Sequence, residues 1–330
     1  MSVKFLVIRL SSIGDIVLTT PVVRCLKQQY PGAEIHFLTK SVYRSVLSAN
    51  PYIDRLHLVN GRVSDVKLTL QQEQFDYVID LHQNIRSNKV RSYLKAKAFA
   101  YNKLNLQKWL YVNFKHNQLP DVHIVDRYLA TLDSFGVRND GQGLDYFISP
   151  DEEYDLDILP PVFQNGYVAF VLGGTYFTKR LPVSKVIDIC RNMDLPVVLL
   201  GGHAEMAAGE ETAGAVGSKV LNLCGKTSLN EAATLVREAR LVMTNDTGLM
   251  HIASAYRKKI LLFWGNTVPQ FGMSPYLPDA ASINLQVEGL SCRPCSKLGF
   301  HNCPKSHFNC MNLLDTSIAI DWAKSHFKSS

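Results

Sequence analysis

The sequence of 330 residues lacks several features that would assign it to a protein class at once. It has no run of about 18 consecutive apolar residues, so it predicts no membrane-spanning helix. No small-residue cleavage site follows the short apolar run at its N-terminus. That run is therefore interpreted as a first strand and not as a signal peptide, and the protein is expected in the cytoplasm. No segment of about 20–50 residues repeats, which excludes solenoid folds.

Cysteine is scarce, with seven residues in the chain. In a cytoplasmic protein, cysteines serve as thiols or metal ligands more often than as disulfides. Hydrophobic residues make up 46% of the sequence and charged residues 19%, which excludes a disordered chain and indicates a globular one. At about 150 residues per domain, the length predicts two domains.

Acidic residues are missing from Leu81–Pro120, and the positive net charge of the chain is concentrated in its first half. This stretch holds eight basic residues with aromatic residues between them. The basic residues are Arg86, Lys89, Arg91, Lys95, Lys97, Lys103, Lys108 and Lys115. Such a stretch suits an anionic partner: a nucleic acid, a phosphorylated glycan or a membrane surface. A solvated lysine-rich face over ordinary core aromatics explains the same composition.

Two series of strand-type and helix-type patterns follow one another along the chain. The first begins with the apolar run Val3–Leu10 and the second with Tyr167–Leu172. A polar, proline-rich segment lies between them, so we predict one domain over 1–160 and a second over 161–330. Each series indicates a doubly wound, mostly parallel α/β sheet, whose ligands bind beyond the carboxyl ends of the strands. The site is expected in a cleft between the two domains.

The first motif that could carry chemistry is Arg9-Leu10-Ser11-Ser12-Ile13-Gly14-Asp15, directly after the first strand. Gly14 would let the chain turn tightly, and the Asp15 carboxylate could accept a proton from a substrate hydroxyl. Asp15 could equally cap the helix that follows. The motif is not G-x-G-x-x-G, which weighs against a dinucleotide-binding dehydrogenase.

The second motif is the loop Gly173–Pro182, again directly after a strand. Its glycines expose backbone N–H groups, Thr175 and Thr178 offer hydroxyls, and Lys179 adds a positive charge. Together these groups suit a phosphate, although the Walker A spacing is absent. A glycine turn with a surface lysine is the competing interpretation.

The third motif is Thr244-Asn245-Asp246-Thr247-Gly248-Leu249-Met250-His251, between a strand and a helix. N–H groups of the first helical turn, with Thr247 and Gly248, would bind a phosphate, and Asp246 could hold sugar hydroxyls. His251 falls one turn after Thr247 on the same side of the helix, where it is either a ligand-binding or a core histidine.

A fourth pattern, Cys292-x2-Cys295-x7-Cys303-x6-Cys310, gathers four cysteines late in the chain. Four thiols could form a tetrahedral zinc site, although only the first pair has finger-like spacing. Reduced, packed cysteines are the alternative.

Taken together, these motifs resemble glycosyltransferase family 9, the heptosyltransferases that build the inner core of bacterial lipopolysaccharide. The resemblance is carried by RLSSIGDIVLTTPVVRCLKQQYP at the start, KRLP after the mid-chain strand, TNDTGLMHIASA in the second half and the late CRPC…C…C segment. It implies a GT-B fold, in which two Rossmann-like domains face a cleft. It also implies an inverting, metal-independent transferase that uses ADP-heptose.

The resemblance assigns roles to residues. Asp15 matches the family's catalytic carboxylate and Lys179 its donor-phosphate lysine, while Leu181 stands where tryptophan is frequent. The donor-binding set that it implies, on the C-terminal domain, is Thr175, Lys179, Glu205, Lys226, Thr227, Asp246, Thr247, Gly248 and His251. The acceptor-binding set expected on the N-terminal domain is Ser12, Gly14, Lys95, Lys97 and Lys103. No cofactor is implied for catalysis, and zinc on the four cysteines would be structural.

The expected partners are an ADP-sugar and an anionic glycolipid acceptor, with peripheral contact to the inner membrane leaflet as a further possibility and no nucleic acid. Two alternatives remain open. One is a GT-B transferase that uses another nucleotide sugar. The other is a nucleic-acid-binding protein that uses residues 81–120, which would leave the phosphate-type motifs of the second half unexplained.

Overall fold

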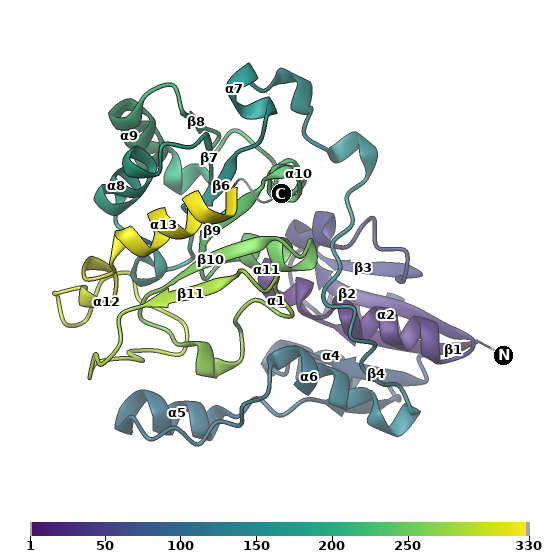
Figure 1. Cartoon of the computed structure of the whole chain (residues 1–330). Coiled ribbons are helices and arrows are strands. Elements are labelled where there is room, and N and C mark those ends of the chain that lie inside the picture. Colours follow the sequence, from purple (N-terminus) through teal and green to yellow (C-terminus); the bar gives the residue numbers. More distant parts are fainter. Residues whose placement is uncertain (1, 328–330) are drawn as a thin grey trace. The chain divides into compact units, whose positions relative to one another are not determined.

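The computed structural model describes residues 2–327, which divide into two compact units. Unit 1 comprises Met1–Leu104 and Val122–Ser149, and unit 2 comprises Asn105–Asp121 and Pro150–Ser330. Each unit is built on a parallel β-sheet with helices packed against it (Figure 1), as the α/β prediction requires. The division differs from the predicted ranges 1–160 and 161–330 in two respects. Residues 150–160 belong to unit 2, and so does the segment 105–121 from the first half of the chain.

The sheet of unit 1 has the strand order β3-β2-β1-β4-β5, and all its neighbouring strands are parallel. The strands are β1 (Val3–Ile8), β2 (Ala33–Lys40), β3 (Arg55–Val59), β4 (Tyr77–Asp80) and β5 (Lys97–Ala100). The helices of this unit are α1 (Ile13–Val17), α2 (Thr20–Gln29), α3 (Lys67–Gln72), α4 (Ile85–Tyr93) and α6 (Ile124–Leu129). Because β1 is central, its carboxyl end lies beside those of β2 and β4, and the loop that carries the first motif starts there.

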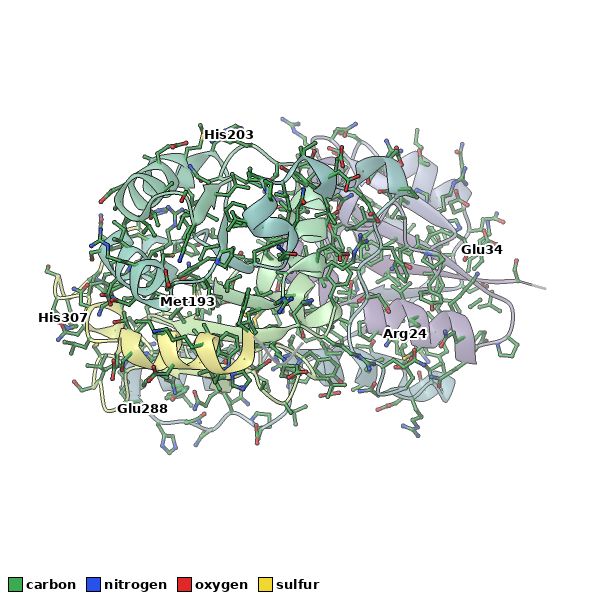
Figure 2. The ribbon with its side chains drawn as sticks, turned by 45° about the horizontal axis from the view of Figure 1, so that its top comes forward. Arg24, Glu34, Met193, His203, Glu288 and His307 are labelled. Carbon is green, nitrogen blue, oxygen red and sulfur yellow. The ribbon has the colours of Figure 1, made fainter. Side chains whose placement is uncertain are left out.

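A buried arginine fixes the helix that follows this loop. Arg24, which lies on α2 and is labelled in Figure 2, is 1% exposed. Its guanidinium donates to Asp140 from Nε at 2.8 Å and also forms an ion pair with Asp145. The pair of carboxylates raises the pKa of Arg24 above its ordinary value, although burial alone would lower it. The network ties α2 to the chain segment that leaves unit 1, so the start of the unit is rigidly held.

The sheet of unit 2 has the order β11-β10-β9-β6-β7-β8 and is likewise parallel throughout. Its strands are β6 (Val168–Val171), β7 (Val197–Leu200), β8 (Val220–Asn222), β9 (Leu241–Asn245), β10 (Lys259–Trp264) and β11 (Ile283–Gln286). Its helices are α5 (Asn105–Phe114), α7 (Pro161–Gln164), α8 (Val183–Met193), α9 (Met206–Val216), α10 (Leu229–Glu238), α11 (Gly248–Ala255), α12 (Asn309–Asn312) and α13 (Thr316–Phe327).

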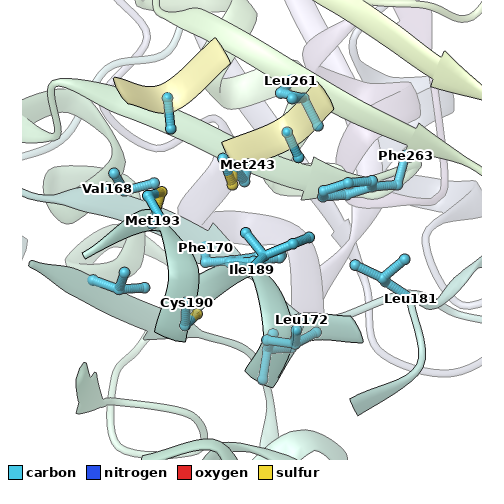
Figure 3. Packing of buried hydrophobic residues seen from close by; sticks show 14 of the residues in the cluster. Val168, Phe170, Leu172, Leu181, Ile189, Cys190, Met193, Met243, Leu261 and Phe263 are labelled. Atoms are coloured by element: carbon cyan, nitrogen blue, oxygen red, sulfur yellow. The ribbon is translucent and has the colours of Figure 1, made fainter. Parts of the chain in front are cut away.

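Two apolar layers hold this second sheet between helices. On one face, strand residues such as Phe170 and Phe263, whose rings stack at 5.8 Å, pack against Ile189 of α8 and Trp322 of α13. Figure 3 shows the labelled part of this cluster, which includes Leu181 from the second motif. The opposite face packs against α7, α10 and α11. Since both faces are covered, the strands are continuous apolar runs, which is why the sequence predicts them.

The two strands predicted to open the domains are present as β1 and β6, each with slightly shorter bounds. Residues 124–135 form an α-helix to Leu129 and a 3₁₀-helix from Ala130, which ends at Gly136 with φ +72°, the conformation of a glycine stop. The strands β8 and β11 do not form clear apolar runs in the sequence, because they have only three and four residues. Within residues 2–327, no helix is long and apolar enough to cross a membrane.

Candidate functional site

Lys179 and Asp246 come together at the carboxyl edge of the second sheet. Lys179 ends a 3₁₀ turn in the loop after β6, and Asp246 follows β9, the neighbour of β6 in the sheet. The Lys179 Nζ atom lies 2.6 Å from Asp246 Oδ2, and both side chains are largely buried. Thr267, which follows β10, donates its hydroxyl to the same Asp246 oxygen at 3.2 Å. The three residues thus follow three adjacent strands. Together they hold the Lys179 ammonium group at the edge where ligands of such sheets bind.

Asn245, the last residue of β9, holds the loop that carries Lys179. Its Nδ2 atom donates to the carbonyls of Leu172 at 3.0 Å and Gly173 at 3.2 Å, and its Oδ1 accepts from the Leu181 N–H at 3.1 Å. One buried amide therefore fixes both ends of the loop. Leu181 itself is buried in the core.

Arg180 and Glu205 form a second ion pair on the same edge. The Arg180 guanidinium lies 3.2 Å from Glu205 Oε1 and donates from Nε to the Gly174 carbonyl at 2.7 Å. Glu205 is buried, and it accepts from the Gly202 N–H at 2.9 Å just beyond β7. The structure therefore brings Glu205 to the glycine loop through Arg180, for which the sequence suggested no role.

Helix α11 begins beside Asp246. Thr247 is its N-cap residue, with extended φ of −146° and ψ of 171°, and Gly248 is the first helical residue. The N–H groups of a first helical turn point outward and carry the positive end of the helix dipole. His251 is buried on α11, 3% exposed, which agrees with a core position.

The remaining predicted donor-binding residues have no contact with the Lys179–Asp246 pair among the interactions described for them. Thr175 is exposed in the glycine loop. Thr178 is buried, and its hydroxyl accepts from the Phe300 N–H at 2.9 Å, so it braces the loop and does not face a ligand. Lys226 follows β8 and lies 3.2 Å from Glu210 of α9 on the surface, and Thr227 is half-buried beside it. Lys226 therefore pairs on the surface at β8 and α9, whereas Lys179 pairs with Asp246.

Asp15 lies at the carboxyl edge of the first sheet, inside α1. Its Oδ1 atom lies 2.6 Å from the Arg9 guanidinium, and its Oδ2 atom accepts from the Ser12 hydroxyl at 2.8 Å and the Ser12 N–H at 3.2 Å. The bond to the Ser12 backbone is the capping contact that the sequence allowed. The Asp15 side chain is 24% exposed, whereas that of Arg9 is 9% exposed, so the carboxylate faces outward from a buried guanidinium.

Arg9 is the positioning residue that the sequence reasoning missed. It also donates to the Tyr128 hydroxyl at 2.9 Å, to the Leu81 carbonyl, and from Nε to the Ser11 carbonyl at 2.9 Å. Burial alone would lower the pKa of Arg9, but Tyr128 and Asp15 hold it above its ordinary value. A fully charged, fully bonded guanidinium thus sets the orientation of Asp15.

Gly14 requires a correction. We predicted that it would make a tight turn, but it lies within α1, where its carbonyl accepts from the Leu18 N–H at 2.9 Å. Gly14 is buried, and Ser12 is exposed at the start of the helix.

The basic residues of 81–120 are dispersed over the two units. Lys103 follows β5 at the same edge as Asp15, where it acts with burial and Arg9 to lower the pKa of His82 to about 4. Lys97 begins β5, with its ammonium 5.1 Å from the Phe99 ring, and Lys95 lines a pocket of about 380 Å³ just before that strand. Because the strands are parallel, Lys95 and Lys97 belong to the amino edge of the sheet. The structure therefore does not bring them together with Asp15, contrary to the expectation of one acceptor-binding set.

Within residues 2–327, the late cysteines do not gather into a metal site. All four late cysteines are free thiols, and no three of these sulfur atoms lie within 4.8 Å of one another, so they present no preformed tetrahedral site. Burial raises the pKa of Cys295 to about 12 and that of Cys310 to about 11, which favours their protonated forms. The predicted structural zinc stays a prediction, and nothing in the site depends on it.

One buried group has the composition of a metal site, His36, His57 and Glu73 in unit 1. The His36 Nδ1 and His57 Nε2 atoms lie 3.0 Å apart. Glu73 is already paired with Lys4 at 3.2 Å and with Arg55. Two cations thus compete with any metal ion for its carboxylate, and the group is best described as a neutralised polar network.

The comparisons with known proteins agree with this architecture. The family model described as glycosyltransferase family 9 (heptosyltransferase) matches residues 63–299. Lipooligosaccharide heptosyltransferase 2 of Haemophilus influenzae is 25% identical over 311 residues, which cover 87% of this chain and 89% of that protein. Among solved structures, a family 9 glycosyltransferase of Veillonella parvula has a TM-score of 0.80 at 21% identity, covering 100% of this chain and 99% of that one. The Escherichia coli ADP-heptose lipopolysaccharide heptosyltransferase II has a TM-score of 0.75 at 19% identity, covering 99% of each chain. The predicted fold class is confirmed.

Proposed function

The chain belongs to glycosyltransferase family 9, the heptosyltransferases, and we propose that it transfers a heptose from ADP-heptose to an inner-core lipopolysaccharide acceptor with inversion at the anomeric carbon. The observation that supports the donor is the cluster of Lys179, Asp246 and Thr267 beside the first turn of α11. This cluster offers a lysine and backbone N–H groups to a diphosphate. The names of two similar proteins support the sugar and the class of acceptor. One is an ADP-heptose lipopolysaccharide heptosyltransferase, and the other is a lipooligosaccharide heptosyltransferase.

The proposed reaction needs little from the protein beyond charge and position. The acceptor hydroxyl oxygen forms a bond to the anomeric carbon, and the bond from that carbon to the diphosphate oxygen breaks with its electron pair. Negative charge then grows on the ADP leaving group, where Lys179 and the start of α11 stabilise it. The hydroxyl proton passes to the Asp15 carboxylate, which Arg9 and Ser12 hold in one orientation.

The experiment that tests this function is a transfer assay with ADP-heptose and defined lipid A–core acceptors, with the product detected by mass. We expect addition of one heptose and release of ADP. Calorimetric titration with other nucleotide sugars provides the comparison. Tighter binding and faster transfer from a UDP- or GDP-sugar would assign the chain to a different donor.

Nucleic acid is not among the proposed partners. The basic residues of 81–120 are divided between the two units, and within unit 1 Lys95 and Lys97 belong to the amino edge of the sheet whereas Lys103 follows β5 at the carboxyl edge. A salt titration of binding to random duplex DNA tests this directly. Micromolar affinity with a steep salt dependence would support the nucleic-acid alternative instead.

Transfer is expected to continue in excess EDTA. The proposed partners of the diphosphate are an ammonium group, hydroxyls and backbone N–H groups, so the leaving group is neutralised without a divalent ion. Initial rates measured with EDTA and with added magnesium check this. A loss of rate that only magnesium or manganese restores would contradict it. Metal analysis of the purified protein would separately test for zinc on the cysteines.

Lys103 is expected to contribute to acceptor binding, whereas Lys95 and Lys97 are not. Lys103 stands at the edge that carries Asp15, and the other two lysines belong to the opposite edge. Replacing Lys103 with alanine should raise the acceptor KM by about fivefold, or about 1 kcal/mol, and this increase should shrink at high salt. The Lys95→Ala/Lys97→Ala double variant is the matched control and should keep the wild-type KM. A larger effect in the double variant would restore the single basic stretch as the acceptor site.

A further inference from the structure

The CRPC motif has no part in the proposed reaction, yet it belongs to a segment that packs against the donor loop within unit 2. The donor loop is 173–182, and the cysteine segment is 292–310. Thr178 of the loop and Phe300 of the segment are bonded to each other. The Thr178 N–H donates to the Phe300 carbonyl at 3.2 Å, and the Phe300 N–H donates to the Thr178 hydroxyl at 2.9 Å. The cysteine segment therefore supports the loop that carries Lys179.

The same segment also holds the chain that follows β10. The Cys295 N–H donates to the Asn266 carbonyl at 3.1 Å, and the Asn266 N–H donates to the Thr178 carbonyl at 3.2 Å. A Cβ atom at Gly265 would lie 2.2 Å from the Thr178 carbonyl oxygen, so only glycine allows the two chains to come this close. Residues 265–267 thus lie between the cysteine segment and the donor loop, and they contact both.

Arg293, inside the CRPC motif, adds a side-chain connection. Its guanidinium donates to the Thr267 carbonyl at 2.8 Å, the Val287 carbonyl at 2.9 Å and the Gln286 Oε1 atom at 3.0 Å. These three acceptors are uncharged, and the side chain is partly buried. Burial lowers the pKa of Arg293 below its ordinary value. A buried charge on neutral acceptors is unfavourable by itself, which points to a role beyond packing.

The backbone around Arg293 is held independently of its side chain. Lys115, which follows α5, donates from Nζ to the Cys292 carbonyl at 3.2 Å and to the Pro294 carbonyl at 2.7 Å. The Arg293 N–H donates to the Leu290 carbonyl at 3.0 Å. Because these bonds use only the backbone of the segment, a substitution of the Arg293 side chain should leave the segment in place.

Thr267 is the residue through which Arg293 reaches the donor site. Arg293 holds the Thr267 carbonyl, and the Thr267 hydroxyl donates to Asp246 Oδ2 at 3.2 Å. The same carboxylate oxygen lies 2.6 Å from Lys179 Nζ. A planar guanidinium fixes its acceptors more closely than a single ammonium group does, because its N–H groups have a fixed geometry. A shift of Thr267 would therefore change the orientation of Asp246 and, with it, that of the lysine.

We propose that Arg293 is a positioning residue of the donor site: through Thr267, it holds the Lys179–Asp246 pair in the orientation that binds the diphosphate. The inference rests on the proposed function, because it requires that this pair receives the diphosphate. It does not depend on a metal ion at the cysteines. It also explains why the cysteine segment packs beside the donor loop, since the segment carries the arginine to the residues after β10.

The test measures donor binding and kinetics in Arg293→Met, which keeps a long side chain and removes its N–H donors. We expect the Kd of ADP and the KM of ADP-heptose to rise by about fivefold, a size typical of residues in one hydrogen-bond network, while the acceptor KM stays unchanged. A merely structural loss would lower kcat through the fraction of active enzyme and leave both KM values as they are. Calorimetric titration with ADP gives the affinity and the binding-competent fraction.

Arg240→Met is the matched control. Arg240 is a partly buried arginine of the same unit whose guanidinium donates to the Phe327 carbonyl at 3.1 Å. It directly precedes β9, whereas Asp246 directly follows that strand, so it belongs to the opposite edge of the sheet. The control variant should keep the wild-type ADP affinity even where its thermal midpoint falls. An equal loss of ADP affinity in both variants would overturn the proposal.

A double-mutant cycle with Thr267→Val tests whether Arg293 acts through Thr267. The double variant should then bind ADP little more weakly than the weaker of the two single variants. Strict additivity, or the wild-type ADP affinity in folded Arg293→Met, would show that Arg293 has no such role. If Arg293→Met lacks a cooperative thermal transition, Arg293→Lys takes its place, because one ammonium group cannot serve three oxygens in the same geometry. A wild-type donor KM in Arg293→Lys would overturn the proposal equally.

Lys179→Ala distinguishes a failure of this inference from a failure of the proposed function. If Lys179→Ala weakens ADP binding and Arg293→Met does not, the positioning role is wrong and the donor site stands. If neither variant weakens ADP binding, the diphosphate does not bind at the Lys179–Asp246 pair, and both proposals fail.

Discussion

Replacing Asp15 with asparagine is expected to lower the turnover number by about 10²–10⁴-fold while the fold and the affinity for ADP-heptose stay as they are. Asparagine has nearly the same shape, and its carbonyl oxygen can still accept from Ser12. It cannot take a proton from the acceptor hydroxyl. It also loses the charge that pairs with Arg9 at 2.6 Å. Steady-state transfer rates and calorimetric binding of the donor measure the two quantities separately.

The Asp15 contact to Ser12 also caps α1, so the experiment must separate catalysis from helix stability. The thermal midpoint of the variant does this, because a lost cap lowers it and a lost base does not. Asp133→Asn provides the control, since Asp133 forms an exposed ion pair with Arg138 at 3.1 Å in the same unit. Near-normal turnover in Asp15→Asn, or a loss that follows the melting temperature, would remove Asp15 from the role of general base.

The chain order of strands and helices could be predicted because both sheets are parallel and covered on both faces. Buried parallel strands are short apolar runs, such as Tyr167–Leu172, and the polar loops after them mark the edge where ligands bind. The alternation places Lys179 and Asp246 after strands at that edge, but it does not make those strands neighbours, because β7 and β8 lie between β6 and β9 in the chain. Their distance of 2.6 Å then results from the pairing of β6 with β9.

The sequence could not supply the residues that hold these groups in place. Arg9 bonds to Tyr128, 119 positions away, and Asn245 bonds to Leu172, 73 positions away. No local pattern encodes such partners, because they depend on how strands and helices assemble. For Asn245, the signal available in the sequence is an amide side chain at the end of a buried strand.

The basic stretch misled the sequence reasoning for a related reason. Composition treats Lys97 and Lys103 as neighbours, but a strand of four residues lies between them and separates the two edges of a sheet. The helix α5 belongs to unit 2 although it precedes the end of unit 1, because Tyr111 and Lys115 find their partners there. A single domain boundary placed at a proline-rich segment cannot show that an earlier segment of the chain belongs to the second unit.

Replacing Lys179 with alanine is expected to lower kcat/KM by about 2–4 kcal/mol of transition-state stabilisation, the loss typical of a preorganised donor to a developing negative charge. The structure adds a second contribution to this loss. Lys179 stands 2.6 Å from Asp246 Oδ2, and both side chains are at most 16% exposed. Without the ammonium group, the Asp246 carboxylate would face the diphosphate with an uncompensated charge, which should also weaken ADP binding.

This second contribution can be isolated with the Lys179→Ala/Asp246→Asn double variant. Removing the carboxylate charge should restore part of the ADP affinity that Lys179→Ala loses, and the two substitutions should therefore be non-additive in a double-mutant cycle. The transfer rate should stay low, because nothing replaces the ammonium group as charge grows on the leaving group. Lys185→Ala is the matched control, since Lys185 donates to the Leu314 carbonyl at 2.8 Å and belongs to α8. If ADP affinity and transfer rate are unchanged in Lys179→Ala, or the two substitutions are strictly additive, the diphosphate does not bind at this pair.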